Sequence, residues 1–502
     1  MSGMETATSS SSRASAATSS SPATAATLRP ASGLDARQFW INTWRPSTTQ
    51  TSYDLTDIEG EVPREIHGTL YRNGPSQQVL PSEGSRALHL FDGDGLVHRL
   101  RIDDGRVSYT GRVVEHPSTL RERAEGRFCM NSVGVTVADP VDPFRIQPNT
   151  NVVFHAGKLM ALVENAYPFE IDRTTLAPVG VNDFQGKMLG MSTSAHPKID
   201  HRTGQMIIHG YQPFEPYLQL YVVEPDGTCS LAESVDAPFS AMAHDMAITE
   251  NYVVFILGAI HFDGLTIMNG GTFKEAVTWK PELGLRFGVR RREAGAQTQW
   301  FTAPTPGYIF HPGNAYEENG KIFMDACTYR DGAALLATLE RARDGRPVPG
   351  FSAVPFLYEL DLATGVCSER QLDERGAEFP RLDDRLVGYK NRYGYAALDR
   401  SAGGDPADTW STIVRYDRQG GSNAVHDFGK WQWPSEPVFV PRHADAAESD
   451  GFVLTIVYDG LSDGSYLAIL DAQNLAAKPL AKCRLEHRIP MGFHGNFAGG
   501  IL

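Results

Sequence analysis

Four histidines of this 502-residue chain lie in similar local sequences, and their side chains could bind a metal ion. His196 lies in Ala-His-Pro-Lys-Ile-Asp, His244 in Met-Ala-His-Asp-Met-Ala, His311 in Ile-Phe-His-Pro-Gly-Asn and His494 in Gly-Phe-His-Gly-Asn-Phe. Imidazole suits iron, copper, zinc and nickel, whereas calcium and magnesium prefer oxygen ligands. These residue types therefore indicate a transition-metal site, provided that the fold brings them together.

The spacing of the four histidines indicates what kind of fold they would need. Their separations are 244 − 196 = 48, 311 − 244 = 67 and 494 − 311 = 183 residues, and none matches the i, i+4 spacing of a helical zinc site. Ligands this far apart meet only where several strands converge on one centre, as at the axis of a β-propeller. Spacing alone does not select these four from the 15 histidines, so ordinary packing remains the alternative for each of them.

Short apolar runs bordered by turn signals predict that most of the chain forms strands. The clearest runs are residues 96–102, 107–114, 151–155, 159–163, 218–223, 252–257, 322–324, 356–360 and 452–458. The 48 glycines and 31 prolines favour frequent turns, and helical periodicity is confined to short insertions such as residues 333–343. This pattern predicts an all-β sandwich, barrel or propeller, and the length of the chain favours the propeller.

Composition excludes several classes of function. The 46 Lys and Arg residues against 60 Asp and Glu residues give a net charge of −14, which argues against binding to a nucleic-acid backbone. The chain has no dinucleotide fingerprint and no P-loop, so we expect no organic cofactor and no kinase. Its Gly-x-Ser-x-Gly match at residues 460–464 falls in the turn after the apolar run 452–458, not between a strand and a helix, so we expect no serine hydrolase either. No apolar run approaches the ~18–20 residues that span a bilayer. Five widely spaced cysteines are typical of free thiols in a reducing compartment.

The chain divides into a short tail and one large domain. Residues 1–36 are rich in Ser, Ala and Thr and are predicted to be disordered; a transit peptide is the alternative. Residues 37–502 have an even composition and are predicted to form a single β-propeller domain. We therefore expect a cytoplasmic protein, with a plastid location as the alternative that a transit peptide would bring.

Several ordered motifs resemble the signatures of the carotenoid cleavage oxygenase family. The first are Leu-Tyr-Arg-Asn-Gly-Pro at residues 70–75 and His-Leu-Phe-Asp-Gly-Asp-Gly at residues 89–95. Later ones are Glu-Phe-Pro-Arg at residues 378–381, Glu-Pro-Val-Phe-Val-Pro-Arg at residues 436–442 and Gly-Phe-His-Gly at residues 492–495. With the runs around His244 and His311, the resemblance covers nearly all of the chain after about residue 39.

The resemblance implies a fold and a metal centre. The fold would be a seven-bladed β-propeller with a helical and loop cap over an axial site for one non-haem Fe(II). The implied iron ligands are His196, His244, His311 and His494. Three glutamates at matching positions would hold three of these imidazoles through their second N–H group: Glu164 with His244, Glu378 with His311 and Glu436 with His494.

The resemblance also implies the reaction, which is the cleavage of a conjugated carbon–carbon double bond by O₂ to give two carbonyl products. Thr150 matches a family position whose side chain crowds a coordination site, with an ordinary strand threonine as the alternative. Phe310, Phe493 and, less directly, Tyr329 are expected to line the cavity for an apolar alkene, and ordinary core packing is the alternative for all three.

The substrate class depends on Val163. Relatives that cleave hydroxylated stilbenes or phenylpropenoids usually carry Lys at this position and a Tyr upstream, and residues 127–133 offer no Tyr. This departure favours a carotenoid or apocarotenoid, with a phenolic alkene such as isoeugenol or vinylguaiacol as the alternative and a non-catalytic binding propeller as a further one. A lipid substrate would require peripheral membrane contact at the mouth of the cavity.

Overall fold

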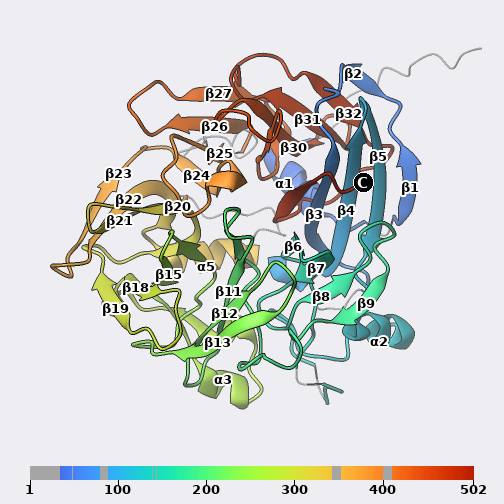
Figure 1. The fold of residues 1–502 in the computed structure, drawn as a ribbon. Helices are drawn as coiled ribbons and strands as arrows, with labels where there is room; N and C mark the ends of the chain where they lie inside the picture. Colours follow the sequence, from blue (N-terminus) through green and yellow to red (C-terminus); the bar gives the residue numbers. More distant parts are fainter. Residues whose placement is uncertain are drawn as a thin grey trace, which may run out of the picture.

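Seven antiparallel sheets surround a common axis and form a seven-bladed β-propeller (Figure 1). The computed structural model describes residues 34–47, 49–79, 89–137, 139–142, 144–341, 352–399 and 410–502. The predicted fold class is therefore confirmed. Of the predicted tail, residues 1–33 lie outside the described residues.

Five blades are four-stranded sheets in which successive strands of the sheet are neighbours. They are, in chain order, β6 (Asn151–His155), β7 (Lys158–Leu162), β8 (Phe169–Ile171) and β9 (Pro178–Val181); β10 (Lys198–Ile199), β11 (Met206–Tyr211), β12 (Leu218–Val223) and β13 (Cys229–Val235); β14 (Met246–Ile248), β15 (Tyr252–Leu257), β18 (Arg286–Arg291) and β19 (Thr298–Thr302); β20 (Tyr308–Glu318), β21 (Lys321–Tyr329), β22 (Val354–Asp361) and β23 (Cys367–Gln371); and β24 (Gly376–Arg381), β25 (Tyr393–Asp399), β26 (Thr412–Asp417) and β27 (Ala424–Asp427).

The other two blades combine strands from the two ends of the chain. One contains β2 (Ile58–Gly60), β28 (Gln432–Pro434), β29 (Val438–Pro441), β30 (Gly451–Asp459), β31 (Gly464–Asp471) and β32 (Ala481–Arg484). The other contains β1 (Thr51–Asp54), β3 (Gly68–Ser76), β4 (Asp94–Asp103), β5 (Arg106–Val113) and β33 (Gly495–Gly499). Because β33 pairs antiparallel with β3 and β2 pairs with β32, these two blades close the ring.

Apolar side chains hold neighbouring blades together. Val254 and Phe287 of one blade lie in the same fully buried cluster as Ile322 and Tyr358 of the next blade. Since a blade is covered on both faces by its neighbours, every residue of strands such as β11 is buried. Burial of this apolar surface is the main contribution to the stability of the ring.

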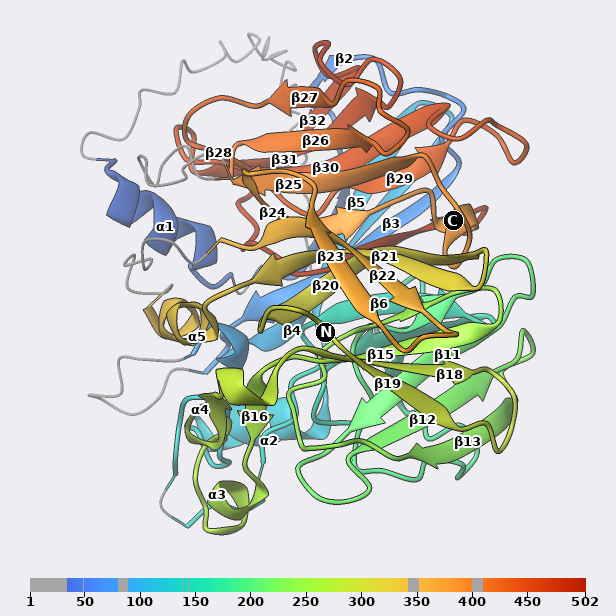
Figure 2. The same cartoon turned by 90° about the vertical axis from the view of Figure 1, so that its left-hand side faces the viewer.

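The α-helices of the described residues lie on one side of the propeller (Figure 2). They are α1 (Ala36–Trp44), α2 (Pro117–Glu125), α3 (Gly264–Met268), α4 (Phe273–Ala276) and α5 (Gly332–Arg341), and a ribbon of β16 (Ile260–Phe262) and β17 (Val277–Trp279) adjoins α3 and α4. The N-cap Asp35 accepts a hydrogen bond from the Gln38 amide at the start of α1, and Phe39 and Trp40 pack on Trp433. Within the described ranges, no helix is long and apolar enough to cross a bilayer.

Candidate metal centre

The inner ends of four blades bring the four predicted histidines together on the propeller axis. His196 and His244 each lie two residues before an inner strand, β10 and β14 respectively, while His311 lies within β20 and His494 directly precedes β33. All four side chains are buried, and their ligand atoms lie within 4.8 Å of one another. Residues that lie up to 494 − 196 = 298 positions apart in the sequence therefore form one cluster.

Irregularities in two inner strands turn side chains toward this cluster. The pairing of β20 with β21 shifts register on both sides of Pro312, next to His311. The pairing of β24 with β25 shifts between Glu378 and Arg381, and Phe379 has a φ of 54°. A bulge of this kind locally redirects the side chains of a strand, so both strands present polar groups at the axis without losing their place in the blade.

Three glutamates contact the histidines in the pairs that the resemblance implied. The Nδ1 atom of His311 donates to Glu378 at 2.6 Å and that of His494 donates to Glu436 at 3.0 Å, while Nδ1 of His244 forms an ion-pair contact with Glu164. Because a carboxylate can only accept, each contact fixes the proton of the imidazole on Nδ1 and leaves the lone pair on Nε2.

The remaining nitrogen atoms fit a metal ion. The Nε2 atoms of His244 and His311 face each other at 3.3 Å, and both carry lone pairs when Nδ1 holds the proton. The Nε2 atom of His196 is buried and has no hydrogen-bond partner among the described residues. A cation between these atoms would accept all of these lone pairs, whereas a purely structural cluster would leave them opposed. Four neutral nitrogen donors suit a divalent transition metal.

The electrostatics of the cluster favour neutral imidazoles and ionised carboxylates. Burial, together with the neighbouring imidazoles, lowers the pKa of His196 well below its usual value, and burial lowers that of His494 to about 3. Burial alone would raise the pKa of Glu164, but the His244 imidazole outweighs it and the pKa is lowered. His311 differs, because Glu378 outweighs burial and raises its pKa.

Several residues around the cluster were not predicted from the sequence. Glu436 also contacts the guanidinium groups of Arg72 and Arg381, each at 3.2 Å, and the hydroxyl of Tyr211 donates to Glu164 at 2.5 Å. Arg72 and Arg381 stand in two of the motifs that carry the family resemblance, so the motifs contained the signal that could have identified them.

His196 is held differently from the other three histidines. Its Nδ1 atom lies 3.9 Å from Asp245 Oδ2, which is beyond hydrogen-bond range, and Asp245 forms an ion pair with Lys198 at 2.8 Å. Three of the four imidazoles thus have a glutamate in direct contact with Nδ1, and the fourth has none among the described residues.

An apolar cavity of about 320 Å³ reaches the cluster from the side of the helices. Its wall includes His244, His311 and His494 as well as the predicted pocket residues Thr150, Phe310, Tyr329 and Phe493, and the departing residue Val163. The Phe310 ring contacts that of His244 with a centroid distance of 4.7 Å. The Thr150 hydroxyl donates to Asn149 at 3.2 Å.

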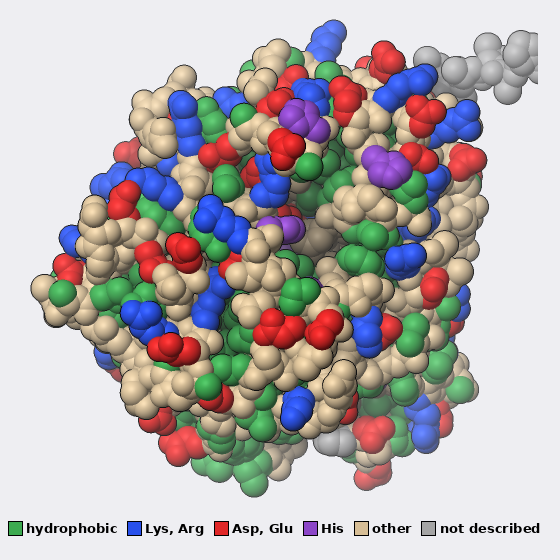
Figure 3. Space-filling view, in the orientation of Figure 1, with side chains coloured by type: hydrophobic (Ala, Val, Ile, Leu, Met, Phe, Trp, Pro, Cys, Tyr) green, Lys and Arg blue, Asp and Glu red, His purple; other side chains and the backbone are tan. Residues whose placement is uncertain are grey.

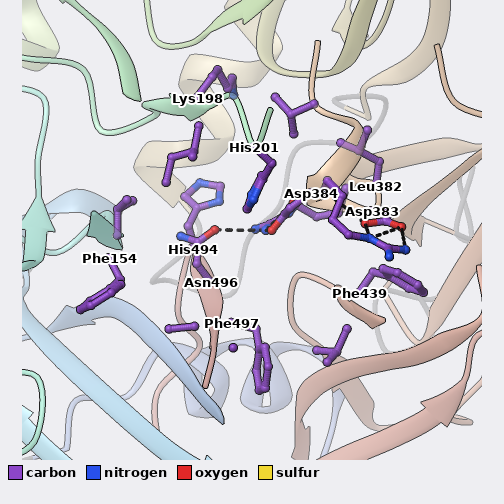
Figure 4. Close-up of a pocket in the computed structure, with 18 of the residues that line it drawn as sticks. Phe154, Lys198, His201, Leu382, Asp383, Asp384, Phe439, His494, Asn496 and Phe497 are labelled. Carbon is purple, nitrogen blue, oxygen red and sulfur yellow. Dashed lines mark hydrogen bonds and ion pairs between the residues drawn. The ribbon is translucent and has the colours of Figure 1, made fainter. Parts of the chain in front are cut away.

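A second, more polar cavity of about 650 Å³ reaches the cluster from the opposite face. The molecule is hollowed near the axis on that face (Figure 3). His201, Lys198 and Asp384 line the channel, and His494 lies at its inner end (Figure 4). The histidine cluster therefore lies between an apolar chamber and a polar channel.

Comparison with known proteins places this architecture in one family. The family model described as retinal pigment epithelial membrane protein matches residues 44–499. The chain is 30% identical to the apocarotenoid-15,15'-oxygenase of Synechocystis over 94% of this chain and 98% of that protein, and 33% identical to the isoeugenol monooxygenase of Pseudomonas putida over 88% and 94%. The crystal structure of the lignostilbene dioxygenase of Pseudomonas brassicacearum superposes with a TM-score of 0.82 at 30% identity, over 91% and 98% of the two chains. The relatives named above are enzymes that cleave carbon–carbon double bonds, and the chain therefore belongs to the carotenoid cleavage oxygenase family.

Proposed function

We propose that this protein uses one Fe(II) ion and O₂ to cleave a conjugated carbon–carbon double bond, without an organic cofactor. The alkene and one O₂ molecule give two carbonyl products, so each alkene carbon receives one oxygen atom. The observation that carries the proposal is the cluster of four buried histidines at the end of an apolar cavity.

The residues of the site have separate tasks in this proposal. His196, His244, His311 and His494 would hold the iron, and Glu164, Glu378 and Glu436 would fix the orientation of three imidazoles. When bound, ferrous iron supplies the redox chemistry that activates dioxygen. Phe310, Tyr329 and Phe493 would position the alkene and exclude water from the reacting carbons.

An apocarotenoid is the first candidate substrate. The wall of the cavity is predominantly aromatic and aliphatic, with Val163 where phenol-cleaving relatives usually have Lys. An apolar polyene loses no hydrogen bonds on entering such a wall. The similarity to an apocarotenoid oxygenase supports this candidate.

An aromatic alkene is the second candidate, and the size of the cavity favours it. A volume of about 320 Å³ lies at the lower end of the range of ~300–1,000 Å³ that is usual for small-molecule sites. A phenylpropenoid or stilbene has far fewer atoms than a long polyene and needs less space. The similarity to isoeugenol monooxygenase and lignostilbene dioxygenase supports this candidate.

An exposed apolar patch near the cavity would admit either substrate from a lipid phase. Leu265 and Met268 of α3 are 66% and 70% exposed, and Met191, at the rim of the cavity, is 68% exposed. Phe214 lies beside Gly264 at the start of α3 and also lines the cavity. Exposed apolar patches of this kind mark contact surfaces. The proposal is therefore a cytoplasmic protein that contacts membranes peripherally through this patch.

The proposal is tested with protein purified anaerobically and loaded with Fe(II). Iron content is measured per chain, and the loaded protein is assayed in air with an apocarotenal, a hydroxystilbene and isoeugenol, with identification of the aldehydes formed. We expect about one iron per chain and aldehyde products from at least one substrate class. Iron far below one per chain, together with no product after Fe(II) addition, would leave a non-catalytic binding propeller as the better description.

A further inference from the structure

The wall of the apolar cavity carries polar atoms that have no hydrogen-bond partner among the described residues. Away from the metal centre, these are Nε1 of Trp44, Oγ of Ser132 and Oε1 of Gln147. Ser132 is 7% exposed and Gln147 is 1% exposed. A buried polar atom without a partner is costly, and three in one apolar wall indicate a group that they bind.

A backbone hydrogen bond pairs the segments that carry Ser132 and Gln147. The Arg145 amide donates to the carbonyl oxygen of Asn131 at 2.7 Å, which pairs the segment before Gln147 with the segment that contains Ser132. Both segments contact the turn around Phe91: Gln147 Nε2 donates to the Phe91 carbonyl oxygen at 3.3 Å, and the Gly134 amide donates to Asp92 at 3.2 Å. The bond to Phe91 also sets the orientation of the Gln147 amide, because a carbonyl only accepts, and so leaves Oε1 as the free acceptor.

Aromatic rings connect these residues with the metal centre. The Phe91 ring lies against Phe493 with a centroid distance of 5.5 Å, and the centroid of the Trp44 ring lies 6.0 Å from that of Phe493. Phe493 immediately precedes His494. Trp44 thus contacts Phe493 directly, and Gln147 is linked to it through Phe91. Trp44, Ser132 and Gln147 line the same cavity as three of the histidines, so one substrate in this cavity can contact both groups.

We propose that Trp44, Ser132 and Gln147 bind a hydroxyl group at the end of the alkene substrate. A hydroxyl group donates one hydrogen bond and accepts others, so it can donate to Gln147 Oε1 while accepting from Trp44 Nε1 or Ser132 Oγ. A carbonyl group would leave Gln147 Oε1 unpaired, and a hydrocarbon end would leave all three atoms unpaired. The inference rests on the proposed function and adds the polar group that the substrate must carry.

The hydroxyl can belong to a phenol or to an alcohol on an apocarotenoid ring, and two pairs of compounds distinguish them. One pair is isoeugenol and the same molecule without its phenolic hydroxyl. The other is an apocarotenal with and without a ring hydroxyl. Dissociation constants are measured anaerobically on the iron-loaded protein by quenching of tryptophan fluorescence, and kcat/KM is measured in air.

The hydroxylated member of at least one pair is expected to bind about tenfold more tightly, the effect of about one well-made hydrogen bond. Ser132→Ala and Gln147→Leu should each reduce this preference toward unity while changing the affinity for the unhydroxylated member little. Thr338→Val is the matched control, since the Thr338 hydroxyl lines the same cavity but already donates to Ala334 at 2.9 Å; its preference should equal that of the wild type.

Equal affinity within both pairs, or a preference that survives in both variants, would overturn the inference. Cleavage of alkenes without any preference would leave the proposed function intact and remove only the hydroxyl site. A preference in binding without cleavage of any alkene would support the hydroxyl site but contradict the proposed function. A preference confined to one pair identifies that pair's hydroxyl as the group recognised.

Discussion

Glu436 makes more contacts than the other two glutamates that hold histidines. One of its oxygens accepts from His494, and the other accepts from the Gly495 amide at 2.9 Å and contacts both Arg72 and Arg381. Burial lowers the pKa of Arg72 to about 10, so its guanidinium is still charged at neutral pH and needs a counter-ion. Glu436 therefore both orients the His494 imidazole and neutralises buried positive charge.

We predict that Glu436→Gln weakens metal affinity by roughly 10–100-fold, the usual effect of losing such a contact. The same change should lower the free energy of unfolding of the metal-free protein by about 3–5 kcal/mol, since it removes the charged partner of the buried Arg72, whereas Arg381 keeps its ion pair with Asp384. Metal titration and urea unfolding measure the two effects. Glu378→Gln is the control, because the contacts of Glu378 are His311 and the Phe379 amide and include no arginine. Equal destabilisation by both variants would contradict this division of roles.

His244→Ala tests the assignment of the ligands. The imidazole of His244 contacts both Glu164 and His311 in the centre of the cluster. Its removal should abolish stoichiometric iron binding, measured by metal analysis after anaerobic loading. Full iron occupancy in this variant would refute the assignment.

At the scale of single residues, the motifs were more informative than the spacing. Fifteen histidines with ordinary separations gave no basis for choosing His196 or His494, and only the family motifs singled them out. The unpaired atoms of Ser132 and Gln147 could not be predicted, because the tertiary structure and not the local sequence decides whether a buried polar group has a hydrogen-bond partner. Val163 stands where phenol-cleaving relatives usually have Lys, and the sequence did not indicate which other residue could bind a polar group of the substrate.

The strands were predictable because their signals are local. Apolar runs such as residues 218–223 and 252–257 coincide with β12 and β15, and the predicted helix at residues 333–343 corresponds to α5 at Gly332–Arg341. The helix α1 was not predicted, since its aromatic residues pack on distant tryptophans and show no strong helical pattern. The bulges beside His311 and Glu378 likewise depend on pairing with other strands.

His98 of β4, which contacts Tyr109 of the adjoining strand β5, should make the stability of the protein depend on pH. Burial, with contributions from His487 and Arg72, lowers the pKa of His98 to about 3, and His98 hydrogen-bonds to the Tyr109 hydroxyl at 2.8 Å. The unfolded chain takes up this proton below about pH 6.5 but the folded protein does not. The contribution of His98 is therefore fully present above that pH and is lost as the pH falls toward 3.

Between pH 7 and pH 5 this loss should amount to about 2 kcal/mol of the free energy of unfolding. His98→Asn cannot take up the proton, so its free energy of unfolding should fall less over the same interval. Urea unfolding of metal-free protein at the two pH values measures the difference, and the remaining titratable groups cancel in the comparison. Identical pH dependence of wild type and variant would show that His98 is not the group responsible.

At the scale of the whole molecule, turns and strand lengths predicted a propeller but not the number of its blades. The repeats are not similar letter for letter, because each blade is constrained by burial on both faces and by few specific residues. The number seven came from the resemblance. The closure of the ring by β3 and β33 joins residues more than 400 positions apart and has no local signal in the sequence.

Two glycines of β33 offer a matched test of ring closure. A Cβ atom at Gly495 would lie 2.2 Å from the Tyr71 carbonyl oxygen of β3, whereas at Gly499 the nearest atom is 4.0 Å away. Gly495→Ala should force β33 away from β3, lower the Tm and reduce metal content, because His494 is the preceding residue. Gly499→Ala should leave both quantities close to those of the wild type. A Gly495→Ala protein with unchanged Tm and metal content would show that this contact is not needed for closure.

The closing strand also imposes an order on maturation. Three of the histidines are made in succession by consecutive blades, whereas the fourth enters the cluster only when β33 has paired with β3. A chain synthesised from its N-terminus would thus hold three imidazoles well before the complete set. In the proposed function, stable metal binding would therefore require a closed ring, and newly made protein should gain its ion after folding rather than during it.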